Sequence, residues 1–206
     1  LGSNTANLKS YQVITSLGSQ GSTTGTDLQG MNGDLTANYA LGADIDASTT
    51  TTWSTNANYK GFTKIGNNTT TADYYSGSFA GLGHVISDLY LYRPLVGVSG
   101  LFAVLSRDGV VRDTGLVNMA ITTNSSGGLV GRNYGAVKNS FTTGSITSQA
   151  GFVGGLVGEN SNDSGLGTGS ITNSYSTASV TALTDIHRQP TSASTPSIST
   201  CIDTCG

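Results

Sequence analysis

A six-residue phrase recurs in the second half of this chain and limits what the chain can fold into. Gly-Leu-Val-Gly-Arg-Asn at 128–133 returns as Gly-Leu-Val-Gly-Glu-Asn at 155–160, an offset of 27 residues. A weaker copy, Gly-Leu-Phe, precedes them at 100–102. Units of this length cannot bury an apolar face alone, but stacked neighbours bury a continuous core. The period therefore predicts a solenoid.

A second phrase follows each copy and indicates that the repeating unit is built from strands. Ala-Val-Lys-Asn-Ser at 136–140 aligns with Ser-Ile-Thr-Asn-Ser at 170–174 only if the later copy carries seven extra residues. The insertion falls in 160–169, which is rich in Gly, Ser and Asn and is expected to be a surface loop. Ile146 and Val180 alternate with hydroxyl side chains, as in a strand with one buried face. No sustained helical periodicity is present, so the fold is predicted to be all-β.

The matched repeat positions predict particular core, corner and ladder residues. Gly131 and Gly158 are expected at corners, where a positive φ or close approach of neighbouring coils excludes a Cβ. Asn139 and Asn173 are equivalent, and we expect their amides to stack as a ladder. A further trace at 84–91 places Asp88 and Asp113 in equivalent positions. The predicted core positions are Leu101, Val111, Leu129, Val137, Ile146, Leu156, Ile171 and Val180.

The domain organisation changes near the carboxyl end. Residues 1–183 are predicted to form the solenoid, and 184–206 a Ser/Thr/Pro-rich tail. Both cysteines of the chain, Cys201 and Cys205, lie in this tail. In an oxidising compartment they would close a small disulfide loop, and two free thiols are the alternative. Because the chain starts at Leu1 without a methionine, we expect a processed or excised product.

Composition and hydropathy argue against nucleic-acid binding and against a transmembrane segment. Charged residues make up 10% of the chain, against roughly 25% in an average soluble domain. The few Lys and Arg residues form no basic stripe, so nucleic acid is not an expected partner. No apolar run approaches the roughly 18 residues of a membrane span, so no transmembrane segment is expected.

The phrases Gly-Gly-Leu-Val-Gly-Arg-Asn at 127–133 and Gly-Gly-Leu-Val-Gly-Glu-Asn at 154–160 resemble the GLUG motif of bacterial surface proteins. The wider stretch from about residue 8 to 182 resembles haemagglutinin-type adhesins exported by two-partner secretion, including the high-molecular-weight adhesins. Ala80 departs from that family, which usually has Asp there, and the amino-terminal secretion domain is not present. The phrases that carry this second resemblance lie at 27–31, 38–41, 44–47, 61–66 and 77–89.

This resemblance implies a right-handed parallel β-helix with an extended carboxy-terminal tail. It also implies export, a place outside the cell or at the bacterial cell surface, and an outer-membrane secretion partner. The function it implies is attachment to a glycan or protein on a host or neighbouring cell. The Cys201–Cys205 pair is similar to one that helps retain some high-molecular-weight adhesins at the outer membrane.

Two sets of residues are candidates for contacts or modification at the surface. Four aromatic residues lie near Trp53 in a segment that leaves the repeat. Exposed, they would form a carbohydrate or receptor platform; buried, they would pin that segment to the solenoid. These residues are Tyr59, Phe62, Tyr74 and Tyr75. Glycosylation sequons of the Asn-x-Ser/Thr type occur at Asn67, Asn68, Asn124 and Asn162.

An enzyme is the third functional hypothesis, because some β-helix enzymes use carboxylates with Arg or Lys. Turn capping is the structural alternative for such residues. Asp44 and Asp46 point the same way along a strand and could bind calcium. His84 lies in a strand phrase, where a structural role is favoured over a Ser-His-Asp triad. The charged candidates are Asp44, Asp46, Asp88, Arg107, Asp108, Arg112, Asp113 and Glu159.

The sequence therefore favours a non-enzymatic adhesin with no cofactor. Its runner-up is a structural subunit that assembles with copies of itself into an extracellular filament. That alternative follows from the open ends of a solenoid, whose unpaired backbone groups favour end-to-end stacking.

Overall fold

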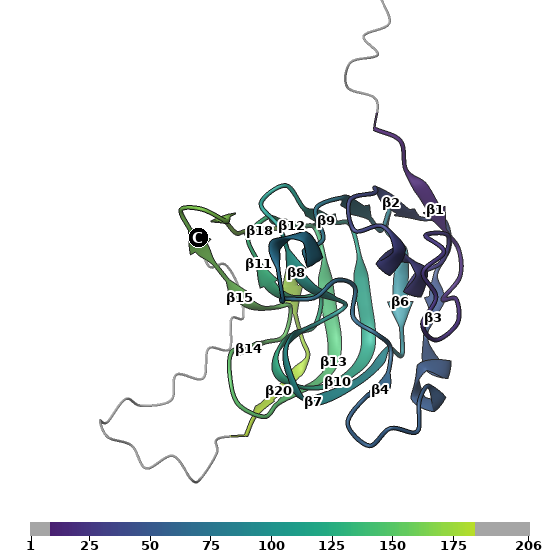
Figure 1. Ribbon diagram of the computed structural model, residues 1–206, viewed down its shortest axis with the longest axis vertical. Helices are drawn as coiled ribbons and strands as arrows, with labels where there is room; N and C mark the ends of the chain where they lie inside the picture. The colour runs from purple at the N-terminus through teal and green to yellow at the C-terminus, as the bar shows by residue number, and fades with distance from the viewer. Residues whose placement is uncertain (1–8, 184–206) are drawn as a thin grey trace, which may run out of the picture.

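The computed structural model describes residues 9–183 of the chain. These residues form a parallel β-solenoid of about five turns, which confirms the predicted all-β class. The turns run from β1 at the right of Figure 1 to β15 and β18 at the left. The predicted tail at 184–206, with Cys201 and Cys205, lies outside the described residues.

The coils contribute strands to three stacked sheets, the third of which has only three strands. The first sheet stacks β1 (Gln12–Ile14), β2 (Tyr39–Leu41), β5 (Ser78–Ala80), β9 (Val110–Arg112), β12 (Ala136–Lys138) and β18 (Ser170–Thr172). The second stacks β3 (Ile45–Asp46), β6 (Val85–Ser87), β10 (Gly115–Gly127), β13 (Phe141–Ser148) and β19 (Tyr175–Ser176), joined by β7 (Tyr90–Ser99), β14 (Val153–Gly154) and β20 (Ser179–Ala182). The third stacks β8 (Phe102–Leu105), β11 (Val130–Asn133) and β15 (Val157–Asn160).

Three segments leave the stack and carry the remaining elements. Residues 15–38 contain the 3-10 helix η2 (Gln29–Gly33). Residues 47–77, here called the excursion, contain η3 (Ser48–Thr52), β4 (Lys60–Gly61) and η4 (Thr71–Asp73). The predicted surface loop at 160–169 is a short hairpin of β16 (Asn162–Asp163) and β17 (Gly167–Thr168).

In-register pairing builds the core from columns of apolar side chains. Phe79, Val111, Val137 and Ile171 are aligned across four strands of the first sheet. Ile121 and Ile146 are aligned with Val180 in the second sheet. The buried residues confirm most predicted core positions: Leu101, Val111, Leu129, Val137, Ile146 and Leu156.

Two predicted core positions differ because they lie in the last described coil. Ile171 is only partly buried, and Val180 is 40% exposed. Both side chains continue core columns, but no further described coil covers them. At the opposite end, Ile14 and Met31 are fully buried, and Leu17 of the 15–38 segment packs with them in the core. One end of the described stack is therefore closed and the other is open.

Gly131 and Gly158 lie within strands β11 and β15, and neither has a positive φ. A Cβ on Gly131 would lie 2.5 Å from Val98 Cγ1 and 2.6 Å from the Ser99 carbonyl oxygen. A Cβ on Gly158 would lie 2.6 Å from the Ser126 carbonyl oxygen. The prediction that these glycines lie at corners is therefore wrong. Of the two reasons offered for them, the close approach of neighbouring chain segments holds and a positive φ does not.

A polar ladder runs along the corner after the first sheet. Asp113, Asn139 and Asn173 all have left-handed backbone conformations, with φ of 55°, 47° and 49°. The Asn139 amide donates to Asp113 at 2.9 Å, and the Asn173 amide donates to Asn139 at 3.2 Å. This confirms the predicted Asn ladder and shows why short polar residues recur there, since they tolerate this conformation.

Asp88 does not belong to that ladder, which corrects the register proposed for the trace at 84–91. Strand β6 pairs with the start of β10 in the second sheet, not with β9. Asp88 therefore occupies a different corner, where it accepts a hydrogen bond from the Asn118 amide at 2.5 Å. A short strand followed by a polar corner residue occurs more than once in a single coil, so the sequence alone aligned Asp88 with Asp113, although they lie at different corners.

The open end leads to a prediction about two aligned core residues. We expect Ile146→Ala to lower the free energy of unfolding by about 2–4 kcal/mol, because it leaves a cavity between two coils. Val180→Ala, in the next strand of the same column, should cost less than about 1 kcal/mol because solvent already reaches it. Urea unfolding of both variants checks the difference. Equal losses would contradict the exposed position of Val180.

Candidate attachment surface

The excursion is held to the solenoid by aromatic side chains. Phe62 and Tyr75 are fully buried in the core. The Tyr75 ring lies 4.9 Å from the ring of Phe102, and its hydroxyl donates to the Ala37 carbonyl at 3.1 Å. Tyr75 also pairs with the last residue of β8 through an isolated parallel bridge. For these two residues the pinning role is the one that the structure shows.

The other two aromatic candidates lie closer to the surface. Tyr74 is partly buried and stacks on Tyr134, with ring centroids 6.1 Å apart. Tyr59 is 46% exposed. Among the four aromatic candidates, Tyr59 is therefore the one that remains available for a surface contact.

Tyr59 lies over the buried guanidinium of Arg93 where β4 pairs with β7, and we call this pair of residues the β4 patch. Strand β4 pairs antiparallel with β7 and places Lys60 opposite Tyr92. The Lys60 amine lies 6.0 Å from the centre of the Tyr92 ring, and the Arg93 guanidinium lies 5.5 Å from the centre of the Tyr59 ring. Figure 1 shows β4 and β7 at the lower edge of the molecule.

The cations of this region are held by backbone oxygens. Arg93 is buried and donates to the carbonyls of Lys60, Phe62 and Tyr92. Lys64 is also buried, and its amine donates to the Val98 carbonyl at 2.7 Å. No Asp or Glu occurs at 47–72 or 89–106, so these two segments carry only positive formal charge.

Burial lowers the pKa of Lys64 to about 8, and the nearby Arg93 contributes to the shift. Between about pH 8 and 10.5 the unfolded chain keeps this proton while the folded chain releases it. Stability must therefore rise with pH in that window. We expect a gain of about 1–2 kcal/mol between pH 7 and 9.5, before unfolded tyrosines begin to ionise near pH 10.

Chemical denaturation at several pH values checks this prediction. The Lys64→Met variant keeps a long apolar side chain but cannot titrate, so its stability should be flat across the same range. If the natural chain loses stability between pH 8 and 9.5, the buried charged amine is not the cause of the pH dependence.

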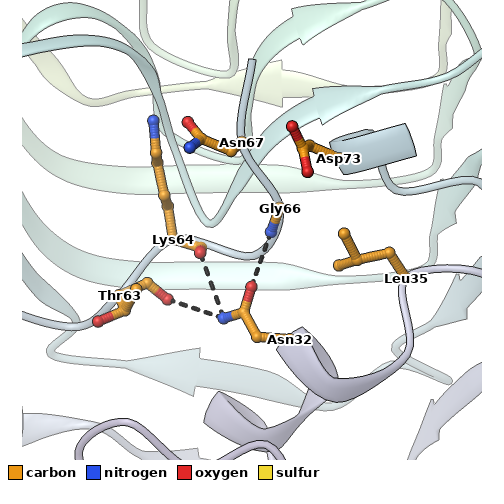
Figure 2. Close-up of a pocket in the computed structure, with 7 residues that line it drawn as sticks. All are labelled: Asn32, Leu35, Thr63, Lys64, Gly66, Asn67 and Asp73. Atoms are coloured by element: carbon orange, nitrogen blue, oxygen red, sulfur yellow. Dashed lines mark hydrogen bonds between the residues drawn. The ribbon is translucent and has the colours of Figure 1, made fainter. Parts of the chain in front are cut away.

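A shallow hollow of about 320 Å³ lies where the excursion meets η2 (Figure 2). The Asn32 amide donates to the carbonyls of Thr63 and Lys64, and its oxygen accepts from the Gly66 N–H at 2.9 Å. Figure 2 shows the Lys64 side chain pointing away from Asn32. At one side of the hollow, the Asn32 side chain thus links η2 to the backbone of the excursion through hydrogen bonds. Its lining residues are Asn32, Leu35, Thr63, Lys64, Gly66, Asn67 and Asp73.

The acidic candidates serve neighbouring backbone and side chains. Asp44 accepts from the Val85 N–H at 3.0 Å and lies 3.0 Å from His84 Nδ1. These contacts hold the pKa of Asp44 below its usual value, with the Val85 N–H as the larger cause. Asp46 instead accepts from the Ser48 N–H at 2.8 Å. Within residues 9–183, no group of three or more His, Cys, Asp or Glu residues could hold a metal ion.

Of the remaining charged candidates, Arg112 and Glu159 lie in strands β9 and β15, and the others lie at turns or corners. Arg112 lies 2.7 Å from Asp113, and Glu159 lies 2.6 Å from Arg132 of the preceding coil. The hydrogen bond from Asn139, aided by Arg112, keeps the pKa of Asp113 low. Arg107 donates to carbonyls of the 160–169 hairpin, and Asp108 is exposed at a turn. These contacts are structural: those at the turns fit the capping role that the sequence offered as the alternative, and the Glu159–Arg132 ion pair joins two neighbouring strands.

The glycosylation sequons differ in accessibility. Asn67 and Asn68 are exposed in the excursion, and Asn162 is exposed in the 160–169 hairpin. Asn124 is partly buried within β10. Three of the four candidate acceptors thus lie where an attached glycan would not disturb the core.

The fold and motifs define the class as a parallel β-solenoid that contains a GLUG motif. The family model for the GLUG motif matches residues 151–181, which include β14 to β19 and all but the last residue of β20. A relative is Halomucin of Haloquadratum walsbyi (strain DSM 16790 / HBSQ001), which is 40% identical over 136 residues. That match covers 64% of this chain and 2% of that protein. No solved structure matches the chain.

These matches support the GLUG part of the resemblance, and the haemagglutinin-type part remains a prediction. Among residues 9–183, no helix has the length and apolar character needed to cross a membrane.

Proposed function

We propose that this chain is a non-enzymatic part of an extracellular surface protein and that its β-solenoid mediates attachment. The GLUG motif and the similarity to a stretch of Halomucin support a surface or secreted location. The scarcity of charge fits a chain whose polarity comes mainly from hydroxyl and amide groups. The acids that we located bind neighbouring groups of the fold, which supports a role other than catalysis.

The observation that carries the attachment proposal is the exposed ring of Tyr59 in the β4 patch. An exposed tyrosine offers an apolar face for a sugar ring and a polar hydroxyl for a hydrogen bond. Arg93 is buried and fixed by three carbonyls, so the cation beside this ring is held in place. A preorganised surface loses little conformational entropy on binding. The partner would be a glycan or protein of a host or neighbouring cell.

Binding of the purified chain to a glycan array and to whole cells tests this proposal. We expect Tyr59→Ala to reduce binding at least about tenfold, while Tyr59→Phe keeps the ring and most of the binding. Leu82→Ala is a matched control, because Leu82 is exposed outside the patch. Unchanged binding by Tyr59→Ala, or equal loss in the Leu82 variant, would overturn the assignment of this surface.

The route of export is a finer proposal that rests on the sequence resemblance. Two-partner secretion at a bacterial cell surface would require an outer-membrane partner. Expression with and without a candidate transporter, followed by fractionation of cells and medium, tests it. Release that is independent of the transporter would contradict this route.

The filament alternative receives less support from the described residues. Head-to-tail stacking needs two open ends of complementary shape, whereas the 15–38 segment closes one end with Leu17, Leu28 and Met31. Only the three-residue strand β1 lies at the edge of the first sheet there.

A further inference from the structure

Two side-chain amides attach the 3-10 helix η2 to the excursion, and we call their hydrogen bonds the η2 contact. The Gln29 amide donates to the Thr63 carbonyl, and its oxygen accepts from the Thr63 N–H, both at 2.9 Å. The Asn32 oxygen accepts from the Gly66 N–H at 2.9 Å. Its amide nitrogen donates at 3.3–3.4 Å to the carbonyls of Thr63 and Lys64. Both positions use a primary amide because this group donates and accepts at once.

Asn32 is followed by Gly33, and this is the one Asn-Gly step in the 206-residue chain. A Cβ on Gly33 would collide with the Thr23 carbonyl oxygen, so the packing admits only glycine there. Asn-Gly is the dipeptide most prone to deamidation, because glycine has no side chain to hinder attack by its backbone nitrogen. The structure therefore requires both members of a labile pair.

Deamidation at this step needs no reactant other than water. The Gly33 nitrogen attacks Asn32 Cγ, the Cγ–Nδ2 bond breaks, and Nδ2 leaves as ammonia together with the Gly33 amide proton. Water then opens the resulting five-membered imide at either carbonyl, which gives aspartate or isoaspartate. Gly33 is exposed and Asn32 is half-buried, so water reaches the site.

The folded structure holds the reacting atoms apart. Asn32 lies inside η2, and a 3-10 turn keeps ψ near about −20 to −30°. At this angle the next backbone nitrogen follows the helix and does not approach Cγ of the side chain. The Gly66 N–H also fixes the side-chain oxygen. Ring closure therefore requires η2 to unwind and the η2 contact to open, as local segments do without global unfolding.

We propose that Asn32 is a site of spontaneous deamidation, that opening of the η2 contact sets its rate, and that the modification makes the opening permanent. A carboxylate still accepts from the Gly66 N–H. Its second oxygen, however, faces the carbonyl oxygens of Thr63 and Lys64 and has no proton to donate to them. Isoaspartate also adds a methylene group to the main chain of η2, which displaces the fully buried Met31.

Peptide mapping by mass spectrometry measures the conversion in the full chain during storage in mildly alkaline buffer. We expect Asn32 to convert at least about tenfold more slowly than in the isolated, unfolded peptide 26–38. Gln29→Ala removes half of the η2 contact without altering the Asn-Gly step, and it should speed the conversion about tenfold. Gln149→Ala is the matched control, because Gln149 lies in the connection after β13, and it should leave the rate unchanged.

Circular dichroism shows whether the Gln29 variant still folds, since Gln29 is buried. Low urea opens the contact without a substitution, so the conversion in the natural chain should accelerate below the unfolding midpoint. Asn32→Asp should speed amide exchange at 63–67, which reports the released contact. A folded chain that converts as fast as the peptide overturns the proposal. Equal rates in the folded Gln29 and Gln149 variants, a rate that ignores low urea, or unchanged exchange in Asn32→Asp overturn it as well.

Discussion

Gly131→Ala is expected to lower the free energy of unfolding by about 3 kcal/mol, a large effect for the addition of one methyl group. The new Cβ would lie 2.5 Å from Val98 Cγ1, 2.6 Å from the Ser99 carbonyl oxygen and 2.7 Å from that of Ala103. Two of these neighbours are backbone atoms of adjoining strands, so relief requires the coils to move apart. Gly158→Ala should show a similar loss, because its Cβ would meet two carbonyl oxygens at 2.6–2.7 Å.

Gly165→Ala provides the control, because its Cβ would meet only a side-chain oxygen of Asp163 at 3.4 Å. It should change stability by less than about 0.5 kcal/mol. Thermal and urea unfolding of the three variants make the comparison. If Gly131→Ala is as stable as Gly165→Ala, the close approach of coils does not restrict this position.

Phe102→Ala is expected to cost about 3–5 kcal/mol, since it removes a fully buried ring from the centre of the stack. Phe102 contacts the Tyr75 ring at 4.9 Å and the Phe79 ring at 5.4 Å, so the loss reaches both the excursion and the first sheet. We also expect faster amide exchange at 62–76, because Tyr75 anchors that segment. Urea unfolding and amide exchange by mass spectrometry check the two effects.

Tyr74→Ala serves as the comparison, because Tyr74 lies in the smaller cluster with Tyr134 outside the main core. Its cost should be clearly lower. Unchanged exchange at 62–76 in Phe102→Ala would show that the excursion is held by contacts other than this aromatic cluster.

The later coils could be predicted from the sequence because their period is short and nearly constant. Asn133 and Asn160 are 27 residues apart, and their amides are hydrogen-bonded at 2.8 Å in neighbouring coils. The same phrase matching placed Asn139 on Asn173. Where no insertion interrupts a coil, residues one period apart in the sequence therefore lie next to each other in neighbouring coils.

The earlier coils could not be aligned in this way. Asn38, just before β2, and Ser78, at the start of the adjacent β5, are 40 residues apart, yet they are hydrogen-bonded to each other. The excursion accounts for this longer coil, and it hides the period. Aromatic residues such as Phe62 and Tyr59 suit both a core and an exposed platform, so composition alone could not separate them. Only the pairing of β4 with β7 and the fit against β8 decide which ring is buried.

The hairpin at 160–169 shows that a connection between two sheets can lengthen while the strands on either side keep their register along the solenoid axis. Strands β15 and β18 keep their register with β11 and β12 although the connection between them is seven residues longer than in the preceding coil. The corner between the third and first sheets is thus a natural point for grafting. Foreign loops, epitopes or short binding peptides could replace 161–168 while the stacked strands keep their own partners. The loop at 161–168 can thus vary in sequence while the stacked strands, which hold the fold together, remain the same.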